Sequence, residues 1–430
     1  MFDTKLTQLD NDVIHQTSVI ISMPYEILED ITVLDLSDQL ASSFCAKTLG
    51  LYGCEVIKIE PPRVGDPTRK WNLSIETESR EDDSPLFLHL NSGKKSATLD
   101  IATQEGKSVF IEMVKRADVI IESFKPNFLM SLGLSFDALK DINQSIILTS
   151  ITPFGQSGPY KDFEYTELTL FALTGAMNRE GLPNREPLRY AGEISQYFAG
   201  NAAAGATTSA LLNRLYTGKG DWIDISIHEC MAGHPHQIGR RAPYVYSGEL
   251  DRREYTRIPS GGIRETYAVG SFKCKDGFVS FLPLGERMWP NIAKMIGRED
   301  LIDHPNFKDG ELRIENVKEL EVIFQGWLDT KTRQEIFEAV QFAAVPGSPI
   351  LQPQEVLKNE QFLARGYFQE VPHDIQGHIS ITGNPFRLPG NIENPISAAP
   401  KLGEHTKQVL TSLADLTEDQ ISNLRKSGIV

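Results

Sequence analysis

The chain has 430 residues, of which 40% are hydrophobic and 23% charged, and its 43 basic and 58 acidic side chains leave a net charge of −15. This composition excludes a mainly disordered chain, and the length favours two domains. The acidic balance argues against nucleic acid or an anionic membrane as partner, and no apolar run approaches the roughly 18–20 residues of a membrane span.

The first twelve residues, MFDTKLTQLDND, lack a basic region followed by an apolar one, so we expect an untargeted, cytoplasmic protein. Four cysteines without a CxxC pair are too few for a disulfide framework. Together with the composition, these features indicate a multidomain enzyme.

The first periodic segments predict a βαβ unit after a polar N-terminal extension over residues 1–27. β-branched and apolar runs predict five strands, at 31–36, 55–60, 96–100, 117–122 and 146–151. Amphipathic or small-residue segments predict three intervening helices, at 41–50, 106–115 and 127–132. We therefore predict an α/β fold with a parallel sheet and right-handed crossovers, whose ligands bind at the carboxyl ends of the strands.

The later part of the chain has a different pattern of predicted helices and strands. An alanine-rich helix is predicted over 199–212 and a strand over 222–226. After about residue 245, alternating residues at 267–272 and 278–282 around Lys275-Asp-Gly277 predict a hairpin, followed by helices to about 343. This pattern indicates a smaller α+β domain. Strand-like segments return at 366–382, and the last predicted helix covers 405–413.

Several familiar site motifs are missing from the sequence. His228 and His234 do not have the i, i+4 spacing of a helical zinc site, because position 232 is alanine, so we expect no metal. No GxGxxG follows the first strand, and no GxSxG elbow or P-loop is found. These absences argue against a nicotinamide or nucleoside-triphosphate enzyme.

A series of phrases, taken together, resembles the family III CoA-transferases of the CaiB/BaiF type, the group of formyl-CoA transferase, carnitine CoA-transferase, benzylsuccinate CoA-transferase and the α-methylacyl-CoA racemases. The phrases are VLDL at 33–36, GCEVIKIEP at 53–61, GDPTR at 65–69, LNSGKKSATLD at 90–100, ADVIIESFKP at 117–126, LGL at 132–134, FGQSGPY at 154–160, TGKGDWIDIS at 217–226, VPGSP at 345–349, ARG at 364–366 and LGEHT at 402–406. The resemblance runs from about residue 28 to the end of the chain.

The resemblance implies a Rossmann-like large domain built from both ends of the chain, a smaller α+β domain, and an interlocked dimer. On this basis the large domain takes residues 28–225 and a return segment over 346–430. A linker over 226–250 then leads to the small domain at 251–345. No permanently bound cofactor is implied, because the coenzyme A thioester is a substrate.

Coenzyme A needs an apolar slot for its adenine and cations for its phosphates. Loops expected at strand ends supply small, apolar and basic side chains for this purpose. The expected CoA-binding residues are Gln39, Ala41, Arg69, Lys94, Lys95, Leu99, Ser123, Phe124 and Lys125. Pro61 follows the second strand, where family members often carry a basic residue, so the resemblance also implies rearranged phosphate contacts.

The nucleophile that the resemblance implies is missing from this chain. In relatives such as formyl-CoA transferase an aspartate attacks the acyl-CoA thioester and forms an aspartyl anhydride, after which CoA passes to the acceptor acid. Counting from Gly192 places Glu193 at that position, and counting back from Gly200 places Gln196 there. Glu167 is the best-placed auxiliary carboxylate, and Thr166 stands where the racemases carry a histidine.

Four functions remain open at this point. The chain is either a transferase that uses Glu193, or an Asp-lacking subunit of a heterodimer with a homologous Asp-bearing chain, as in relatives acting on aryl-substituted succinates. Its substrates would be a succinyl-CoA-like donor and an organic acid, with aryl-substituted dicarboxylic acids among the candidates. The alternatives are an acyl-CoA racemase or isomerase and a non-catalytic acyl-CoA-binding protein.

Overall fold

The computed structural model describes residues 28–71, 84–234, 242, 244–249, 267–283, 285–373, 377–387 and 396–430. The predicted N-terminal extension and much of the predicted linker lie outside these residues. The chain divides into two compact units. Unit 1 comprises Met1–Thr174, Ala191–His234 and Ala364–Val430, and unit 2 comprises Gly175–Tyr190 and Pro235–Leu363.

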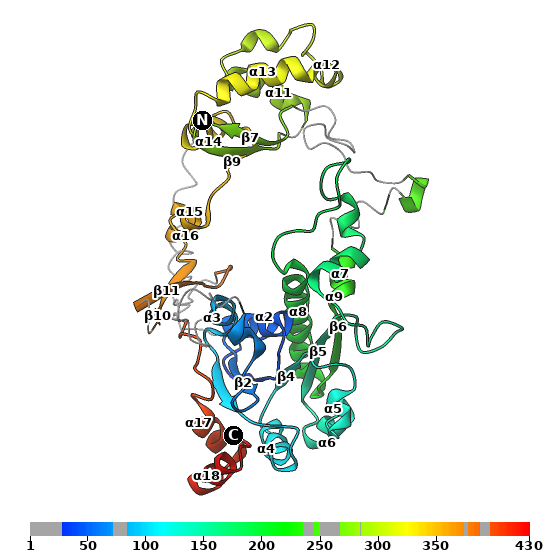
Figure 1. Cartoon of the computed structure of the whole chain (residues 1–430), viewed down its shortest axis with the longest axis vertical. Helices are drawn as coiled ribbons and strands as arrows, with labels where there is room; N and C mark the ends of the chain where they lie inside the picture. Colours follow the sequence, from blue (N-terminus) through cyan, green and yellow to red (C-terminus); the bar gives the residue numbers. More distant parts are fainter. Residues whose placement is uncertain are drawn as a thin grey trace, which may run out of the picture. The chain divides into compact units, whose positions relative to one another are not determined.

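Unit 1 is built on a sheet in which, among the described residues, six strands run parallel in the order β3-β2-β1-β4-β5-β6 (Figure 1). The strands are β1 Thr32–Asp35, β2 Glu55–Glu60, β3 Lys95–Thr98, β4 Val119–Glu122, β5 Ile147–Thr152 and β6 Trp222–Ser226. β-branched residues dominate them, as expected for strands covered on both faces. The predicted α/β fold with a parallel sheet is confirmed.

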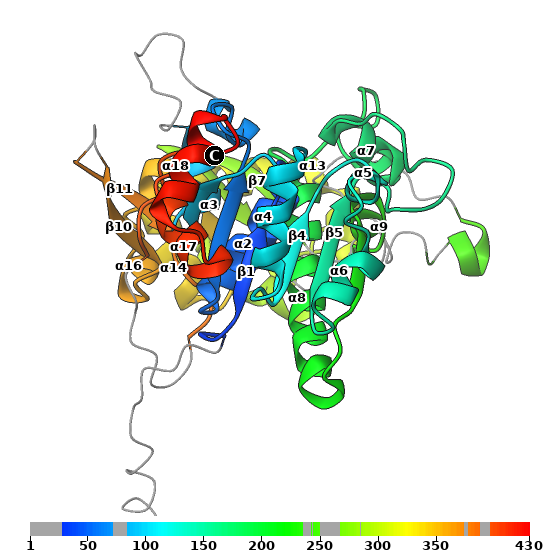
Figure 2. The ribbon, with the colours of Figure 1, turned by 90° about the horizontal axis from the view of Figure 1, so that it is seen from below.

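Helices cover both faces of this sheet because neighbouring strand residues point to opposite sides. Val33 packs with α2 (Leu40–Leu51) and α8 (Ile194–Thr217) on one face. Leu34 packs with α4 (Gln104–Val114) and α17 (Thr406–Ala414) on the other, which is the near face in Figure 2. The remaining helices of unit 1 are α3 Pro85–Asn91, α5 Phe128–Ser131, α6 Phe136–Ile142, α7 Glu167–Leu173, α9 Ile227–Ala232 and the 3₁₀ helix η1 Pro67–Lys70.

The C-terminal segment returns to the sheet beside β3. α17 lies against β3 and α4, and the Asp100 N–H donates to the carbonyl of Ile429 at 2.9 Å. A further helix, α18 (Glu418–Lys426), follows α17, so the prediction that the helix at 405–413 is the last one was wrong. The predicted strands near 366–382 form an antiparallel hairpin, β10 Phe368–His373 with β11 Gly377–Thr382.

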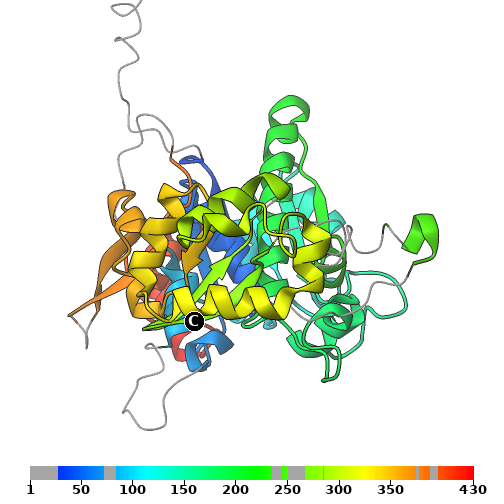
Figure 3. The ribbon, with the colours of Figure 1, turned by 90° about the horizontal axis from the view of Figure 1, so that it is seen from above.

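Unit 2 contains an antiparallel sheet with helices packed on it, and Figure 3 looks onto these helices. The hairpin predicted around Lys275 is confirmed as β7 Gly270–Cys274 and β8 Gly277–Phe281, joined by β9 Gly347–Pro349. Phe272, Phe281 and Phe324 pack edge to face in its core. Its helices are η3 Ala176–Arg179, η4 Glu286–Met288, α11 Trp289–Met295, η5 Glu299–Leu301, α12 Gly310–Glu315, α13 Val317–Leu328, α14 Arg333–Phe342 and α15 Pro353–Val356, with α16 Glu360–Ala364 at its boundary with unit 1.

Two features are absent from the described part of the chain. No helix there is both long and apolar enough to span a membrane. No three His, Cys, Asp or Glu side chains gather there as a metal site would require.

Candidate functional site

The strand order reverses between β1 and β4, and the loops that follow these two strands separate there. Such a switch point is where open α/β sheets bind ligands. Gln39, after β1, donates from Nε2 to the Ser123 carbonyl oxygen after β4 at 3.3 Å. The Ser123 hydroxyl donates to Asp38 Oδ1 at 2.8 Å and accepts from the Asp38 N–H at 3.1 Å. Gln39 and Ser123, both expected from the sequence to bind CoA, are therefore brought together.

The start of α8 closes this cluster with an amide rather than a carboxylate. Gln196, in the first turn of α8, is 6% exposed, and its Oε1 has no hydrogen-bond partner among the described residues. Tyr165 lies beside it and donates its hydroxyl to Gln39 Oε1. Burial raises the pKa of Tyr165 to about 12. The Tyr165 hydroxyl is thus protonated at neutral pH.

Glu167, the predicted auxiliary carboxylate, holds the start of α8. It is buried in the first turn of α7, where Thr166 caps the helix. Its Oε1 accepts from the Ser195 N–H at 2.9 Å, and its Oε2 accepts from the Ser195 hydroxyl. Both carboxylate oxygens are therefore engaged in positioning Ser195 and, with it, the neighbouring Gln196.

Glu193, the predicted nucleophile, occupies the N-cap position of α8 and is half-buried. Its carbonyl oxygen accepts the N–H groups of Gln196 and Tyr197 at 3.1 and 3.3 Å, but its side chain does not cap the helix. Gly192, with a φ of 74°, adopts the left-handed conformation that leads the chain into this turn.

Two acids at the switch point were not anticipated as site residues. Glu122 ends β4 and is 4% exposed, and it accepts the Phe124 N–H at 2.7 Å. Burial raises its pKa to about 7, and burial also raises the pKa of Asp38. In the sequence, only their position could have indicated that these acids belong to the site. An acidic residue directly after a buried apolar strand lies at the ligand-binding edge of the sheet.

The basic residues expected to bind phosphate are each engaged with a carboxylate. Arg69 is buried, with Nε and Nη2 each 2.8 Å from the Glu60 carboxylate, and it stacks on Phe87. Lys94 Nζ lies 2.7 Å from Asp35 Oδ2 inside the core. Lys95 pairs with Glu55, and the exposed Lys125 pairs with Glu164.

These basic residues also lie at different places on the sheet. Lys94 and Lys95 precede and begin β3, so they lie at its amino end rather than on the strand-end loop where we expected them. Lys125 follows β4 on the surface, next to the switch point. The structure therefore does not bring the four predicted cations together.

The predicted apolar contacts lie near the sheet edge. Ala41 is buried in α2, and Leu99 is buried directly after β3. Phe124 follows β4 and packs against Phe128 with ring centroids 4.7 Å apart. Phe124 directly follows Ser123 and therefore places an aromatic ring next to the switch point.

Comparisons with known proteins show which family the chain belongs to. The family model for CoA-transferase family III matches residues 28–406. Formyl-CoA:oxalate CoA-transferase of Streptomyces avermitilis is 28% identical over 418 residues, which are 94% of this chain and 99% of that protein. The beta subunit of succinyl-CoA–L-malate CoA-transferase of Chloroflexus aurantiacus is 28% identical over 409 residues, which are 94% of this chain and 98% of the relative.

The solved structure of a CaiB/BaiF family protein from Brucella suis has a TM-score of 0.76 to this chain at 28% identity. The match covers 89% of this chain and 98% of that one. Fold, motifs and family model therefore lead to one conclusion. The chain belongs to CoA-transferase family III.

Proposed function

We propose that this chain is the Asp-lacking subunit of a two-subunit CoA-transferase and works with a homologous Asp-bearing chain. The observation that supports this most is Gln196, whose buried amide lies beside Tyr165 at the switch point. The family reaction needs a carboxylate that attacks the thioester carbonyl and forms an anhydride as the CoA thiolate leaves. An amide oxygen has no such nucleophilicity.

The other carboxylates near Gln196 support the same proposal. Glu167 is held by Ser195 through both oxygens, so releasing it would leave the Ser195 N–H without its partner. Glu122 and Asp38 are buried acids whose pKa values burial raises, which lowers the fraction of nucleophilic carboxylate. These groups fit binding and positioning better than attack on a thioester.

The proposed substrates are those that the family resemblance suggests. A succinyl-CoA-like donor and an organic acid acceptor, with aryl-substituted dicarboxylic acids among the candidates, fit a transferase of this kind. The Chloroflexus relative is itself named as the beta subunit of a succinyl-CoA-dependent transferase, which supports a heteromeric assembly. Thr166 caps α7, so it supplies no acid/base group for a racemase.

A second candidate is an active homodimer that uses Glu193. It is favoured by the position of Glu193 at the N-cap of α8, three residues before Gln196. A glutamate carboxylate is chemically capable of the anhydride route, but a displacement on the order of 1 Å costs about 10²-fold in rate. We place this candidate behind the two-subunit enzyme, and we place a non-catalytic acyl-CoA-binding protein behind both.

A CoA-exchange assay with Glu193→Gln separates the two enzymes. The purified chain is incubated with succinyl-CoA and a panel of dicarboxylic acids, alone and together with an Asp-bearing homologue. We expect exchange only in the mixture, with Glu193→Gln changing its rate less than about threefold. Exchange by the chain alone, abolished by Glu193→Gln with CoA binding retained, would establish the homodimer instead.

A further inference from the structure

Lys47, in the middle of α2, is a buried lysine whose hydrogen-bond partners are all neutral. Its side chain is 3% exposed. Its Nζ donates to the His89 carbonyl oxygen at 2.6 Å and to the Thr382 hydroxyl at 3.3 Å, and it lies 3.3 Å from His89 Nδ1. Among the described residues, no carboxylate forms an ion pair with it. Lysine is seldom buried without an acidic partner, so this environment distinguishes Lys47 from the paired lysines of the core.

The contacts of Lys47 join three elements that are distant in sequence. Lys47 belongs to α2 and His89 to the last turn of α3, whereas Thr382 ends β11 of the antiparallel hairpin. This hairpin follows shortly after Ala364, where the chain re-enters unit 1. The Lys47 amine therefore fastens the β10–β11 hairpin to α2 and α3, near the point where the chain returns to unit 1.

The same cluster supports the first turn of α8. The Phe44 ring meets the Tyr197 ring edge to face, with 4.8 Å between centroids, and the His89 ring lies 6.2 Å from that of Tyr197. Phe44 also stacks with His89, with 6.4 Å between centroids. Tyr197 directly follows Gln196, so movement of His89 removes a ring contact from the turn that carries Gln196.

We propose that Lys47 is a pH-dependent latch, whose uncharged amine holds the β10–β11 hairpin on α2 and α3 and whose protonation loosens that hairpin. Charging the amine places an ammonium group in a buried site that offers only neutral acceptors, and burial of an unpaired charge is unfavourable. When the hairpin opens, water solvates the ammonium group, so protonation favours the open hairpin. The latch goes beyond the proposed transferase function and is independent of it.

The groups that surround Lys47 leave it as the one that changes charge above neutral pH. Burial, with a contribution from the charge of Lys94, lowers the pKa of Lys47 to about 7. Asp35 on β1 pairs with Lys94. Burial and Lys47 lower the pKa of His89 on α3 to about 4, and burial raises the pKa of Tyr197 on α8. His89 and Tyr197 therefore stay neutral where Lys47 gains or loses its proton.

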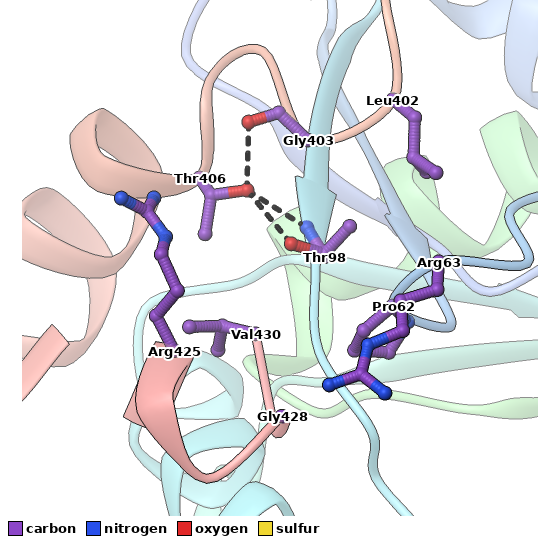
Figure 4. A pocket seen from close by; sticks show the side chains of 9 residues that line it. All are labelled: Pro62, Arg63, Thr98, Leu402, Gly403, Thr406, Arg425, Gly428 and Val430. Atoms are coloured by element: carbon purple, nitrogen blue, oxygen red, sulfur yellow. Dashed lines mark hydrogen bonds between the residues drawn. The ribbon is translucent and has the colours of Figure 1, made fainter. Parts of the chain in front are cut away.

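Further along, the returning segment is fixed by neutral contacts. Asn384 Nδ2 donates to the Leu51 carbonyl oxygen at 3.2 Å. At the start of α17, Thr406 Oγ1 accepts the Thr98 N–H at 3.0 Å and donates to the Gly403 carbonyl oxygen at 2.8 Å, as the dashed lines in Figure 4 mark. Because amide and hydroxyl groups carry no charge, these contacts do not respond to pH. The latch therefore acts on the hairpin, and α17 serves as an internal reference.

Hydrogen exchange of the full chain, followed by mass spectrometry between about pH 7 and pH 9, measures how often the hairpin opens. The open hairpin has the ordinary lysine pKa of 10.5 and the closed one a pKa of about 7, so opening takes up a proton across this range. After correction for the intrinsic exchange rate, the opening constant from peptides of β10 and β11 should fall about tenfold per pH unit as pH rises. Peptides of α17 should change less than about twofold.

Lys47→Met keeps the length of the side chain and removes the titrating amine, so its hairpin should open equally often at every pH, within about twofold. Lys407→Met, at an exposed position on α17, is the control and should keep the wild-type pH dependence. The wild-type series tests the latch even if a variant fails to fold. An opening constant independent of pH in the wild type, or a pH dependence that persists in Lys47→Met, would overturn the inference. An equal fall in the α17 peptides would assign the effect to the whole of unit 1 and overturn it as well.

Discussion

Gln196, Glu193 and Glu167 occupy neighbouring positions at the start of α8 and α7, yet they differ in the chemistry available to them. The first is a neutral amide, the second is a half-buried carboxylate at a helix N-cap, and the third is committed to Ser195. Their identities were visible in the sequence. Their roles depended on contacts between segments about 30 residues apart, such as Glu167 with Ser195, which no local pattern predicts.

The cations that were expected to bind phosphate illustrate the same distinction. Arg69 and Lys94 were expected at the site because of their residue type and because they lie in sequence motifs that resemble those of the family. The partners Glu60 and Asp35 neutralise them inside the fold.

Glu122→Gln should make stability less dependent on pH. Burial raises the pKa of Glu122 to about 7 from an ordinary value of 4.5, so the folded state holds the proton more tightly than the unfolded state. The stability that this group contributes is therefore full below about pH 4.5 and declines as pH rises through about 7. Glutamine keeps an acceptor for the Phe124 N–H and carries no charge.

We expect Glu122→Gln to match the wild type in urea unfolding near pH 5 and to exceed it at pH 8 by on the order of 2–3 kcal/mol. Glu112→Gln, at an exposed position paired with Lys115, serves as the control and should shift stability by about 0.5 kcal/mol or less at both pH values. An equal offset for Glu122→Gln at pH 5 and pH 8 would show that its ionisation does not govern the difference.

At the scale of elements, α8 packs on α2 through small residues. Gly200 allows the close approach, because a Cβ there would lie 2.6 Å from the Ala41 carbonyl oxygen and 3.0 Å from Phe44 Cδ1. Gly205 lies on the same helix with nothing within 4 Å of its Cβ position. Alanine substitution at Gly200 therefore measures the steric cost of a close contact, and alanine substitution at Gly205 measures helix propensity alone.

Gly200→Ala should destabilise the protein by about 1–3 kcal/mol, since the added methyl group forces the two helices apart. Gly205→Ala should stabilise it by about 0.5–1 kcal/mol, because alanine has the higher helix propensity and meets no neighbour. The midpoints of urea unfolding give both changes in unfolding free energy, provided that the dependence of this free energy on urea concentration is unchanged. Destabilisation of similar size by both substitutions would mean that the contact with Ala41 does not limit the packing.

Lys58 joins several elements through buried charge. It donates to the Ser37 carbonyl at 2.8 Å and pairs with Asp35 and Asp66, all of them shielded from solvent. Lys58→Met should cost about 3–5 kcal/mol, because it leaves the buried carboxylate of Asp66 without its counter-charge, while Asp35 keeps Lys94. The exposed pair of Lys407 with Glu418 offers a contrast, and Lys407→Met should cost less than about 1 kcal/mol. If Lys58→Met and Lys407→Met lowered the free energy of urea unfolding equally, burial of the ion pair would have no special role.

Most elements were predictable because their periodicity is strong and their turns carry glycine. α18 was not predicted, because its sequence EDQISNLRK is largely polar and buries mainly Ile421. A signal was nevertheless present, since Thr417 and Gln420 form a capping box and Gly428 follows the helix end.

For the whole molecule, the fold class was predictable from the alternation of strand and helix patterns. The family was predictable from short sequence motifs that occur in a characteristic order along the chain. Assembly lies outside what local patterns determine, and the interlocked dimer stays a prediction. The end of α8 exposes Leu212, Leu215 and Tyr216 at 55%, 79% and 83%. An apolar patch of this kind is a common mark of a protein–protein interface.

The assembly should persist on dilution to nanomolar concentration, because interlocked subunits separate only by unfolding. Mass photometry measures this directly. We expect a single species of two chains at every concentration, with a homologue of similar size as the second chain when the complex is isolated from its source. Monomers that form reversibly on dilution would argue against interlocking.

Intact-mass measurement after hydroxylamine trapping tests most directly whether this chain carries its own nucleophile. The isolated chain is incubated with succinyl-CoA and then with hydroxylamine, which converts an acyl-activated carboxylate into a hydroxamate. We predict no label on the wild type or on Glu193→Gln, and label at position 196 in Gln196→Asp and on the aspartate of an Asp-bearing homologue. A hydroxamate on Glu193 of the wild-type chain would contradict the two-subunit enzyme and establish Glu193 as the nucleophile.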